Sequence, residues 1–211
     1  MILYGSSFSP FVRKTMAYCA EKGLEIEVKP VGLGSPDPAF RAASPFGKMP
    51  GFSDGDFAIS DSTAIITYLE AKHPAPPLLP ADPASRARTV WYEEFADTIL
   101  IATMGKLFFN RFVSPRFLGK QGDLAAADKA EREELPPLFD YLERVVPASG
   151  FLVDDALTLA DLAVASPFVN MAHVGVSPGA AHPRVAAYVA GILARPSFAP
   201  IVAQEKAFAA R

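Results

Sequence analysis

Cysteine and histidine are scarce in this sequence of 211 residues. It contains one cysteine, Cys19, and three histidines, none of which has metal-ligand spacing from another. A single cysteine excludes an internal disulfide and a cysteine-rich metal centre. Cys19 recurs at helical spacing with Val12 and Met16, so we interpret it as a small buried hydrophobe. The sequence predicts no metal site and is typical of a protein of the reducing cytosol.

Long hydrophobic runs and an excess of one charge are also missing. No stretch approaches the ~20 apolar residues that span a bilayer. Residues 1–4 run directly into Gly5 and two serines, without the apolar region of a signal peptide. The formal net charge is only −3, which gives no basic surface for nucleic acid. We therefore expect a cytoplasmic protein with no membrane partner and no nucleic-acid partner.

Proline is plentiful, and the first prolines help to delimit a strand, a helix and a second strand. Residues 2–4 form a short apolar run, which is typical of a buried strand. Ser9-Pro10 then provides an N-cap followed by proline at the first helical position, and the helical spacing continues to about residue 22. Polar and apolar residues alternate over 25–29, as in a half-buried strand. Since a helix joins the two strands, we expect them to be parallel neighbours.

A hairpin and a second helix are predicted next. Residues 32–48 are rich in Gly, Pro and Ser and are interpreted as a surface loop with at most a short helix. Two short antiparallel strands fit 49–59, and Ser60-Asp61-Ser62 caps a helix that ends before Pro74. Met49-Pro50 enters a strand, where proline cannot donate to the ladder. A cis peptide there is one hypothesis, and a trans proline on an edge strand is the alternative.

The second half of the chain is predicted to be entirely helical. A proline-dense linker spans 75–83. Helical windows follow at 84–112, 124–146, 158–171, 183–193 and 197–208. We therefore expect an α/β domain at residues 1–76, with the order βαβ-ββα, and an all-α helical bundle at 84–211.

Several motifs follow one another along this framework. They are Ser9-Pro10-Phe11 with Arg13, Ala20-Glu21-Lys22-Gly23-Leu24, Gly47-Lys48-Met49-Pro50, Asp61-Ser62-Thr63-Ala64-Ile65 with Tyr68-Leu69-Glu70, and Leu157-Thr158-Leu159-Ala160-Asp161. In this order they resemble the cytosolic glutathione transferases over essentially the whole chain. The resemblance implies a thioredoxin-like N-terminal domain, a homodimer, and an enzyme that activates the thiol of glutathione for attack on a small hydrophobic electrophile. The alternatives are a non-catalytic binding protein of the same fold and a cysteine-type thioltransferase, which the lack of a cysteine in the first loop disfavours.

The resemblance also implies where glutathione binds as co-substrate. Met49, just before Pro50, would pair its backbone with the cysteinyl part, and Lys48 would meet the glycyl carboxylate. Asp61 and Ser62 would hold the γ-glutamyl end, and a helix N-terminus is physically suited to a carboxylate. The alternatives are a solvated lysine and a plain N-cap.

Ser9 is the candidate thiol activator. The thiolate is the nucleophile, and a hydroxyl at a helix N-terminus can lower the pKa of a thiol. Counted back from the Ala20 motif, Ser9 falls where tau and zeta transferases, which the loop resembles, keep their catalytic serine. Tyr4, Ser6 and Ser7 compete for this role, and Ser9 could also serve only as a cap.

The electrophile pocket is expected where the helical half faces Ser9. Its candidate residues are Phe11, Met104, Phe108, Arg111 and Phe112, of which the last four recur at helical spacing. If Arg111 lines the pocket, acidic substrates are favoured. A stripe of this kind can equally belong to the core. The residues 198–208 are expected to close the site.

Overall fold

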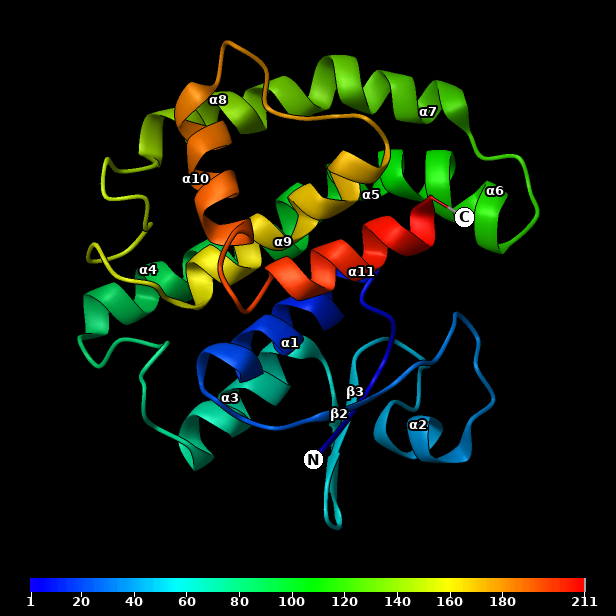
Figure 1. Ribbon diagram of the computed structural model, residues 1–211, viewed down its shortest axis with the longest axis vertical. Coiled ribbons are helices and arrows are strands. Elements are labelled where there is room, and N and C mark those ends of the chain that lie inside the picture. The colour runs from blue at the N-terminus through cyan, green and yellow to red at the C-terminus, as the bar shows by residue number, and fades with distance from the viewer. Residues whose placement is uncertain (211) are drawn as a thin grey trace.

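A four-stranded mixed sheet forms the centre of the N-terminal half, as Figure 1 shows. This computed structural model describes residues 1–210. The strands are β1 (Ile2–Tyr4), β2 (Glu27–Lys29), β3 (Gly51–Asp54) and β4 (Phe57–Ser60), in the order β2-β1-β3-β4. β1 pairs in parallel with β2 and antiparallel with β3, and β3 pairs antiparallel with β4. The predicted βαβ-ββα order and the parallel first pair are confirmed.

The two faces of the sheet are covered differently because successive side chains of a strand point to opposite sides. Leu3 belongs to the main core with Val12 of α1 (Pro10–Glu21) and Ile65 of α3 (Ser62–Lys72). Its neighbour Tyr4 joins a smaller cluster with Phe40 of α2 (Pro38–Ala43). The sheet thus has α1 and α3 on the face that meets the helical half and α2 on the other.

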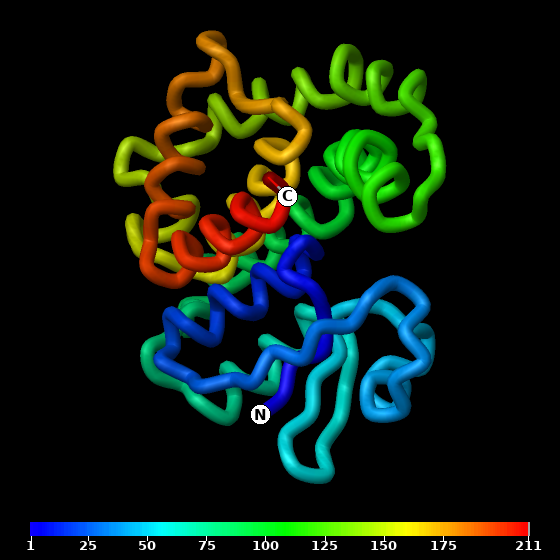
Figure 2. The backbone as a smooth tube through the Cα atoms, turned by 45° about the vertical axis from the view of Figure 1, so that its right-hand side comes forward, coloured from blue at the N-terminus to red at the C-terminus, as the bar shows by residue number. Residues whose placement is uncertain are grey.

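Every named element from Pro83 to Ala209 is a helix. The helices are α4 (Pro83–Glu94), η1 (Phe95–Leu100), α5 (Ile101–Phe108), η2 (Phe109–Val113), α6 (Ser114–Phe117), α7 (Leu124–Lys129), η3 (Ala130–Glu134), α8 (Leu135–Val145), α9 (Leu159–His173), α10 (Pro183–Leu193) and α11 (Ala199–Ala209), where η marks π-helical turns. Figure 2 shows this bundle stacked on the N-terminal half. Within the described residues, no helix combines the length and hydropathy needed to cross a bilayer.

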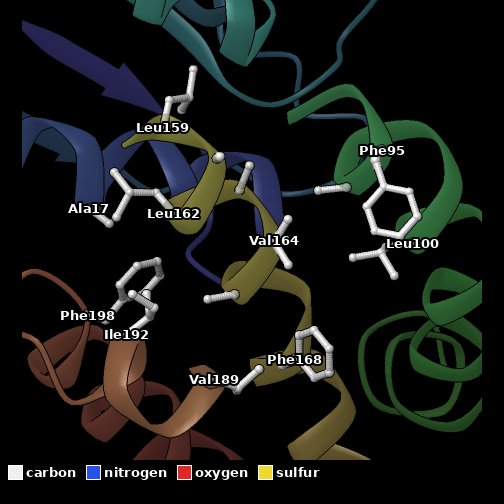
Figure 3. Close-up of a cluster of buried hydrophobic side chains, with 14 of the residues drawn as sticks. Ala17, Phe95, Leu100, Leu159, Leu162, Val164, Phe168, Val189, Ile192 and Phe198 are labelled. Carbon is white, nitrogen blue, oxygen red and sulfur yellow. The ribbon is translucent and has the colours of Figure 1, made fainter. Parts of the chain in front are cut away.

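Helix α9 runs through the middle of the molecule. Its residues from Leu159 to Met171 are buried, and its side chains pack with Ala17 of α1, Phe95 of η1 and Phe198 before α11 (Figure 3). At its N-terminus the Asp161 carboxylate accepts the N–H of Thr158 at 2.9 Å, as in a capping box. Because α9 contacts both halves, it fixes how they are docked.

Several boundaries differ from the sequence prediction. The second strand begins at Glu27 rather than residue 25, and the hairpin begins at Gly51 rather than residue 49. The window predicted over 84–112 continues through two π-helical segments to Phe117. A π turn accommodates an extra residue, so a pattern counted at 3.6 residues per turn does not reveal it. The Met49-Pro50 peptide bond is cis, as hypothesised.

Candidate active site

A cavity of about 740 Å³ opens between the sheet half and the bundle. The loop after β1, the loop after β2 and the segment before β3 line one side, and α5 to α6 with part of α9 line the other. Its polar lining includes Ser6, Ser9, Lys48 and Asn170. Its apolar lining includes Phe8, Phe11, Met49, Met104, Phe108 and Phe117. The cavity therefore combines two hydroxyls, one amide and one charged group with an apolar wall that contains several phenylalanines.

Ser9 lies at the N-terminus of α1, at the edge of this cavity. Its Oγ is the N-cap acceptor for the N–H of Val12, at a long 3.5 Å. Accepting this bond leaves the hydroxyl proton of Ser9 free to donate to another group. The positive end of the α1 dipole stabilises negative charge at the same place. Ser9 can therefore act as the cap and still donate to an anion in the cavity.

The other candidate thiol activators, Tyr4, Ser6 and Ser7, differ in whether they reach the cavity. Ser6 lines the same cavity. Tyr4 is only 4 % exposed, and its hydroxyl lies 3.4 Å from Ser53 Oγ, within the small cluster on the far face of the sheet. The hydroxyl of Ser7 contacts Glu205 and helps to lower the pKa of that carboxyl. Of the four candidates, Ser6 and Ser9 line the cavity.

The segment before β3 forms a rim on the same side of the cavity as the Ser9 loop. Lys48 and Met49 both line the cavity, and Pro50 is buried behind them. Ser44 Oγ donates to the carbonyl of Lys48 at 2.7 Å, which anchors the segment to the end of α2. Met49 packs against both hydrophobic clusters, so the backbone on this rim is fixed from two sides.

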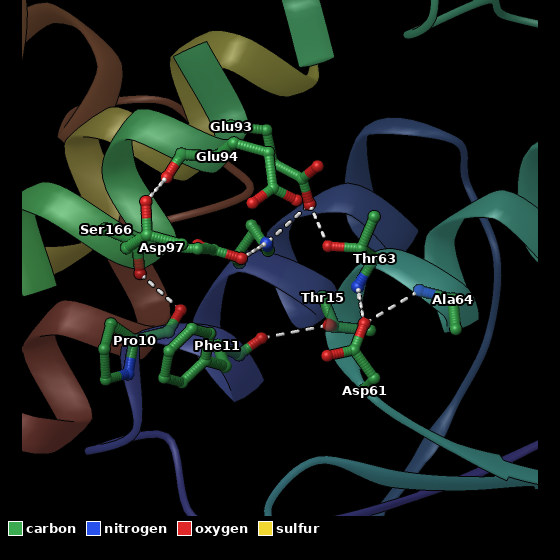
Figure 4. Close-up of polar contacts among 12 residues, drawn as sticks. Pro10, Phe11, Thr15, Asp61, Thr63, Ala64, Glu93, Glu94, Asp97 and Ser166 are labelled. Carbon is green, nitrogen blue, oxygen red and sulfur yellow. Dashed lines mark hydrogen bonds and ion pairs between the residues drawn. The ribbon is translucent and has the colours of Figure 1, made fainter. Parts of the chain in front are cut away.

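Asp61 and Ser62 lie at the N-terminus of α3, beside a second hollow. The Asp61 carboxylate accepts the N–H groups of Thr63 and Ala64 at 2.9 and 3.1 Å, and it caps α3 with a φ of 81° (Figure 4). A positive φ is uncommon outside glycine, but aspartate tolerates it better than most residues. Ser62 is buried beneath this cap. Both residues are therefore placed apart from the Ser9 cavity.

The second hollow adjoins the first. It encloses about 830 Å³, and Asp61, Thr63 and Asp97 are among its lining residues. Phe11 lines both hollows. An extended ligand passing Phe11 would thus reach from Ser9 to the N-terminus of α3.

Two of the predicted pocket residues are placed elsewhere. Arg111 lies in η2, and its guanidinium pairs with Asp128 of α7 and Glu131 of η3 at 2.7 and 2.5 Å. Phe112 is 6 % exposed and packs against the rings of Phe108 and His173. Neither residue lines the cavity, because their side chains turn into helix contacts. Arg111 and Phe112, predicted from the sequence as pocket residues, are therefore not among the residues that line this cavity, and the preference for acidic substrates loses its support from Arg111.

Sequence models of known families match both halves of the chain. The glutathione S-transferase N-terminal domain matches residues 3–77, and the glutathione S-transferase C-terminal domain matches residues 100–196. Glutathione S-transferase 3 of Zea mays is 34 % identical over 209 residues, covering 95 % of this chain and 92 % of the relative. The chain belongs to the glutathione S-transferase family.

Solved transferase structures agree with this assignment. A glutathione S-transferase from Rhodospirillum rubrum superposes with a TM-score of 0.86 at 26 % identity, covering 95 % of this chain and 90 % of the other. Glutathione S-transferase-I bound with lactoylglutathione superposes with a TM-score of 0.82 at 27 % identity, covering 96 % and 98 %. The thioredoxin-like N-terminal half and the helical C-terminal half are thus confirmed for this transferase.

The structure shows where Cys19 lies in this transferase and whether its described residues form a metal-binding group. Cys19 is buried in the core, and burial raises the pKa of its thiol to about 12, so it stays protonated. In residues 1–210, no group of three or more His, Cys, Asp or Glu side chains is arranged to hold a metal ion.

Several lining residues of this transferase cavity were not predicted from the sequence. Phe8 lies in the loop after β1, beside Ser9. Its ring packs against Phe117 of α6 and Phe208 of α11, with ring centroids 5.7 and 5.5 Å apart. Asn170 comes from the last turn of α9. An asparagine in a largely apolar helical window was the available signal, because a buried amide needs hydrogen-bond partners.

Proposed function

We propose that this protein binds reduced glutathione along the two adjoining hollows and transfers it to a hydrophobic electrophile. Ser9 donates a hydrogen bond to the glutathione sulfur and lowers the pKa of the thiol. The thiolate then attacks the electrophile, forming a carbon–sulfur bond in conjugation, or serving as the nucleophile in related isomerase or peroxidase chemistry. The observation that carries this proposal is the placement of Ser9 and an aromatic wall on one cavity.

The proposed glutathione contacts follow from the rims of the hollows. Met49 offers its backbone to the cysteinyl part, and Lys48 offers its ammonium to the glycyl carboxylate. The N-terminus of α3, with Asp61 and Ser62, receives the γ-glutamyl end, where the helix dipole favours a carboxylate and Asp61 favours the ammonium. The position of Phe11 on both hollows supports one continuous ligand path.

The proposed electrophile pocket is the apolar part of the Ser9 cavity. Phe11, Met104 and Phe108 line it together with Phe8 and Phe117. An aromatic and thioether surface favours apolar ring compounds over charged ones. The pocket therefore fits small hydrophobic electrophiles, which conjugation would make more soluble, as in detoxification. We place this activity in the cytoplasm, where the thiol pool is kept reduced.

Titration with reduced glutathione tests this function. We expect calorimetry to show binding in the micromolar to millimolar range, and a chromogenic aryl halide to be conjugated only when glutathione is present. Oxidised glutathione serves as the control, because it has no free thiol. Absence of any binding by reduced glutathione would contradict the proposed function.

We also propose a homodimer. Phe46, in the loop between α2 and β3, is 89 % exposed, and the side chains of Val90, Trp91 and Ile99 on α4 and η1 are also exposed. Apolar surface of this kind is stabilised when a second copy covers it. We expect the mass in solution at micromolar concentration to be that of two chains, and a monomer mass would contradict the dimer.

Replacing Phe46 with serine is expected to weaken the dimer about tenfold or more, as for an aromatic side chain at the centre of an interface. Leu124→Ser is the matched control, since Leu124 is exposed on α7, in another part of the bundle. Sedimentation over a concentration series measures both variants. An unchanged dissociation constant for Phe46→Ser would show that Phe46 is not part of the dimer interface.

A further inference from the structure

A fully buried arginine lies beneath the Ser9 loop. Arg13 of α1 is 0 % exposed, and its Nε and Nη2 donate to the two carboxylate oxygens of Glu205 in α11, at 2.9 and 2.8 Å. Its Nη1 donates to the carbonyl of Ser166 at 2.7 Å and to Oδ1 of Asn170 at 2.9 Å, both in α9. Arg13 thus connects three helices that are far apart in the sequence.

Glu205 is held as the buried anion of this cluster. Its side chain is 1 % exposed, and His173 Nε2 lies 3.1 Å from Oε2. Burial raises the pKa of Glu205, but the hydrogen bond from His173 and the charge of Arg13 outweigh it and leave the pKa below its ordinary value. The carboxylate therefore stays ionised, and Arg13 keeps a bidentate partner that fixes its guanidinium plane.

The two α9 side chains that meet Arg13 also hold the backbone on both sides of Ser9. Asn170 Nδ2 donates to the carbonyl of Phe8 at 2.8 Å. Ser166 Oγ donates to the carbonyl of Pro10 at 2.7 Å, as Figure 4 shows. Phe8 and Pro10 are the residues before and after Ser9. The path of the backbone through Ser9 is therefore fixed from α9.

The arginine also fixes which way the Asn170 amide points. An amide has one accepting oxygen and one donating nitrogen, so turning it over would place NH₂ against the cation and oxygen against the Phe8 carbonyl. With Oδ1 bound to Arg13, Nδ2 faces Phe8. The charge of Arg13 thereby determines the orientation of the neutral hydrogen bond between Asn170 and Phe8, beside Ser9.

We propose that Asn170, Ser166 and Arg13 are positioning residues that hold Ser9 in the geometry needed to hydrogen-bond the glutathione sulfur. This inference rests on the proposed function of Ser9. The three residues act on Ser9 through the Phe8 and Pro10 carbonyls. The Ser9 hydroxyl must lie within hydrogen-bond distance of the sulfur. A small displacement of the loop therefore weakens the lowering of the thiol pKa by this hydroxyl.

Asn170→Asp tests this role with little change in volume. An aspartate still accepts from Arg13, but it cannot donate to Phe8 when ionised and places an oxygen against that carbonyl. We expect kcat to fall about tenfold or more, with a smaller change in the KM for glutathione. We also expect the pKa of the bound glutathione thiol, read from thiolate absorbance, to rise. Ser166→Ala loses the Pro10 bond and a long 3.5 Å contact with Arg13. It should lower kcat and raise the thiol pKa in the same way, and it replaces Asn170→Asp if that variant does not fold.

Arg195→Gln is the matched control. Arg195 pairs with Glu21 of α1 at 2.7 Å and also joins the two halves, but away from the Ser9 loop. We expect it to leave kcat and the thiol pKa unchanged. Equal losses in Arg195→Gln and Asn170→Asp would overturn the proposal, since docking of the halves alone would explain them. An effect of Asn170→Asp on KM alone would also overturn it, because Asn170 would then be a glutathione contact.

Hydrogen–deuterium exchange without glutathione separates this inference from the proposed function. We expect the amides of residues 6–12 to exchange faster in Asn170→Asp and in Ser166→Ala than in wild type, while Arg195→Gln leaves them unchanged. Exchange that stays at the wild-type rate in both α9 variants overturns the positioning role. Faster exchange in a protein that fails to bind glutathione supports the positioning contacts and contradicts only the proposed function.

Discussion

Replacing Ser9 with alanine is expected to lower turnover by about 10- to 100-fold while glutathione binding stays near the wild-type level. A hydrogen bond to a charged group contributes about 1.5–3 kcal/mol, and each 1.4 kcal/mol is about a factor of ten. The Ser9 hydroxyl is free to donate because its cap bond to Val12 uses only a lone pair. Steady-state kinetics with an aryl halide and calorimetry with glutathione measure the two quantities separately.

Three variants control this result. Ser9→Thr keeps the hydroxyl and should retain most of the turnover. Ser6→Ala removes the other hydroxyl on the cavity, and Tyr4→Phe removes one on the far face of the sheet. Neither should approach the effect of Ser9→Ala. Wild-type rates in Ser9→Ala would eliminate Ser9 as the thiol activator, and a large loss in Ser6→Ala would transfer the role to Ser6.

Replacing Lys14 with methionine is expected to reduce the free energy of unfolding by about 3–5 kcal/mol, the range for removing one partner of a buried ion pair. Lys14 of α1 is 1 % exposed and pairs with Glu93 of α4 at 2.8 Å and Asp97 of η1 at 2.6 Å. Burial raises the pKa of Asp97 to about 6, although Lys14 opposes the shift. Without Lys14 nothing opposes this shift, so in the variant Glu93 loses its cation and Asp97 must either take up a proton or stay unpaired, and both outcomes cost stability. Urea unfolding at pH 7 measures the loss.

An exposed pair provides the control for Lys14. Lys106 lies 2.6 Å from Glu134, but both side chains are at least one-third exposed, so Lys106→Met should change stability by less than about 1 kcal/mol. Adding Glu93→Gln to Lys14→Met should recover part of the loss, because one buried charge is removed. A loss below about 1 kcal/mol in Lys14→Met alone would show that water reaches these carboxylates.

Local signals in the sequence were sufficient for most of the fold. Ser9-Pro10 and Asp61 are caps that act on residues two to three positions ahead, so their helices could be predicted without any knowledge of tertiary structure. The apolar run of the first strand, the alternation of the second and the prolines of the linker are equally local. The placement of Ser9 and Lys48 beside one cavity could be predicted only through the family resemblance.

The side-chain positions that could not be predicted from the sequence depend on distant partners. Arg111 recurs at helical spacing with Met104 and Phe108, but its guanidinium pairs with Asp128 and Glu131, which belong to other helices. The π-helical turns η1 and η2 also alter which side chains share a face. Asn170 meets Phe8 across 162 positions of sequence. Periodicity within one segment contains no information about such contacts.

The bond between Arg13 and Glu205 can form only late in the synthesis of the protein. The two residues are 192 positions apart, and Glu205 belongs to the last helix of the described chain. While the protein is being translated, the guanidinium beneath the Ser9 loop has no carboxylate to pair with until α11 has left the ribosome. The contacts beneath this loop are thus completed only after α11 has been synthesised. A polypeptide cut short before Glu205 would keep Ser9 but would lack the ion pair that supports its loop.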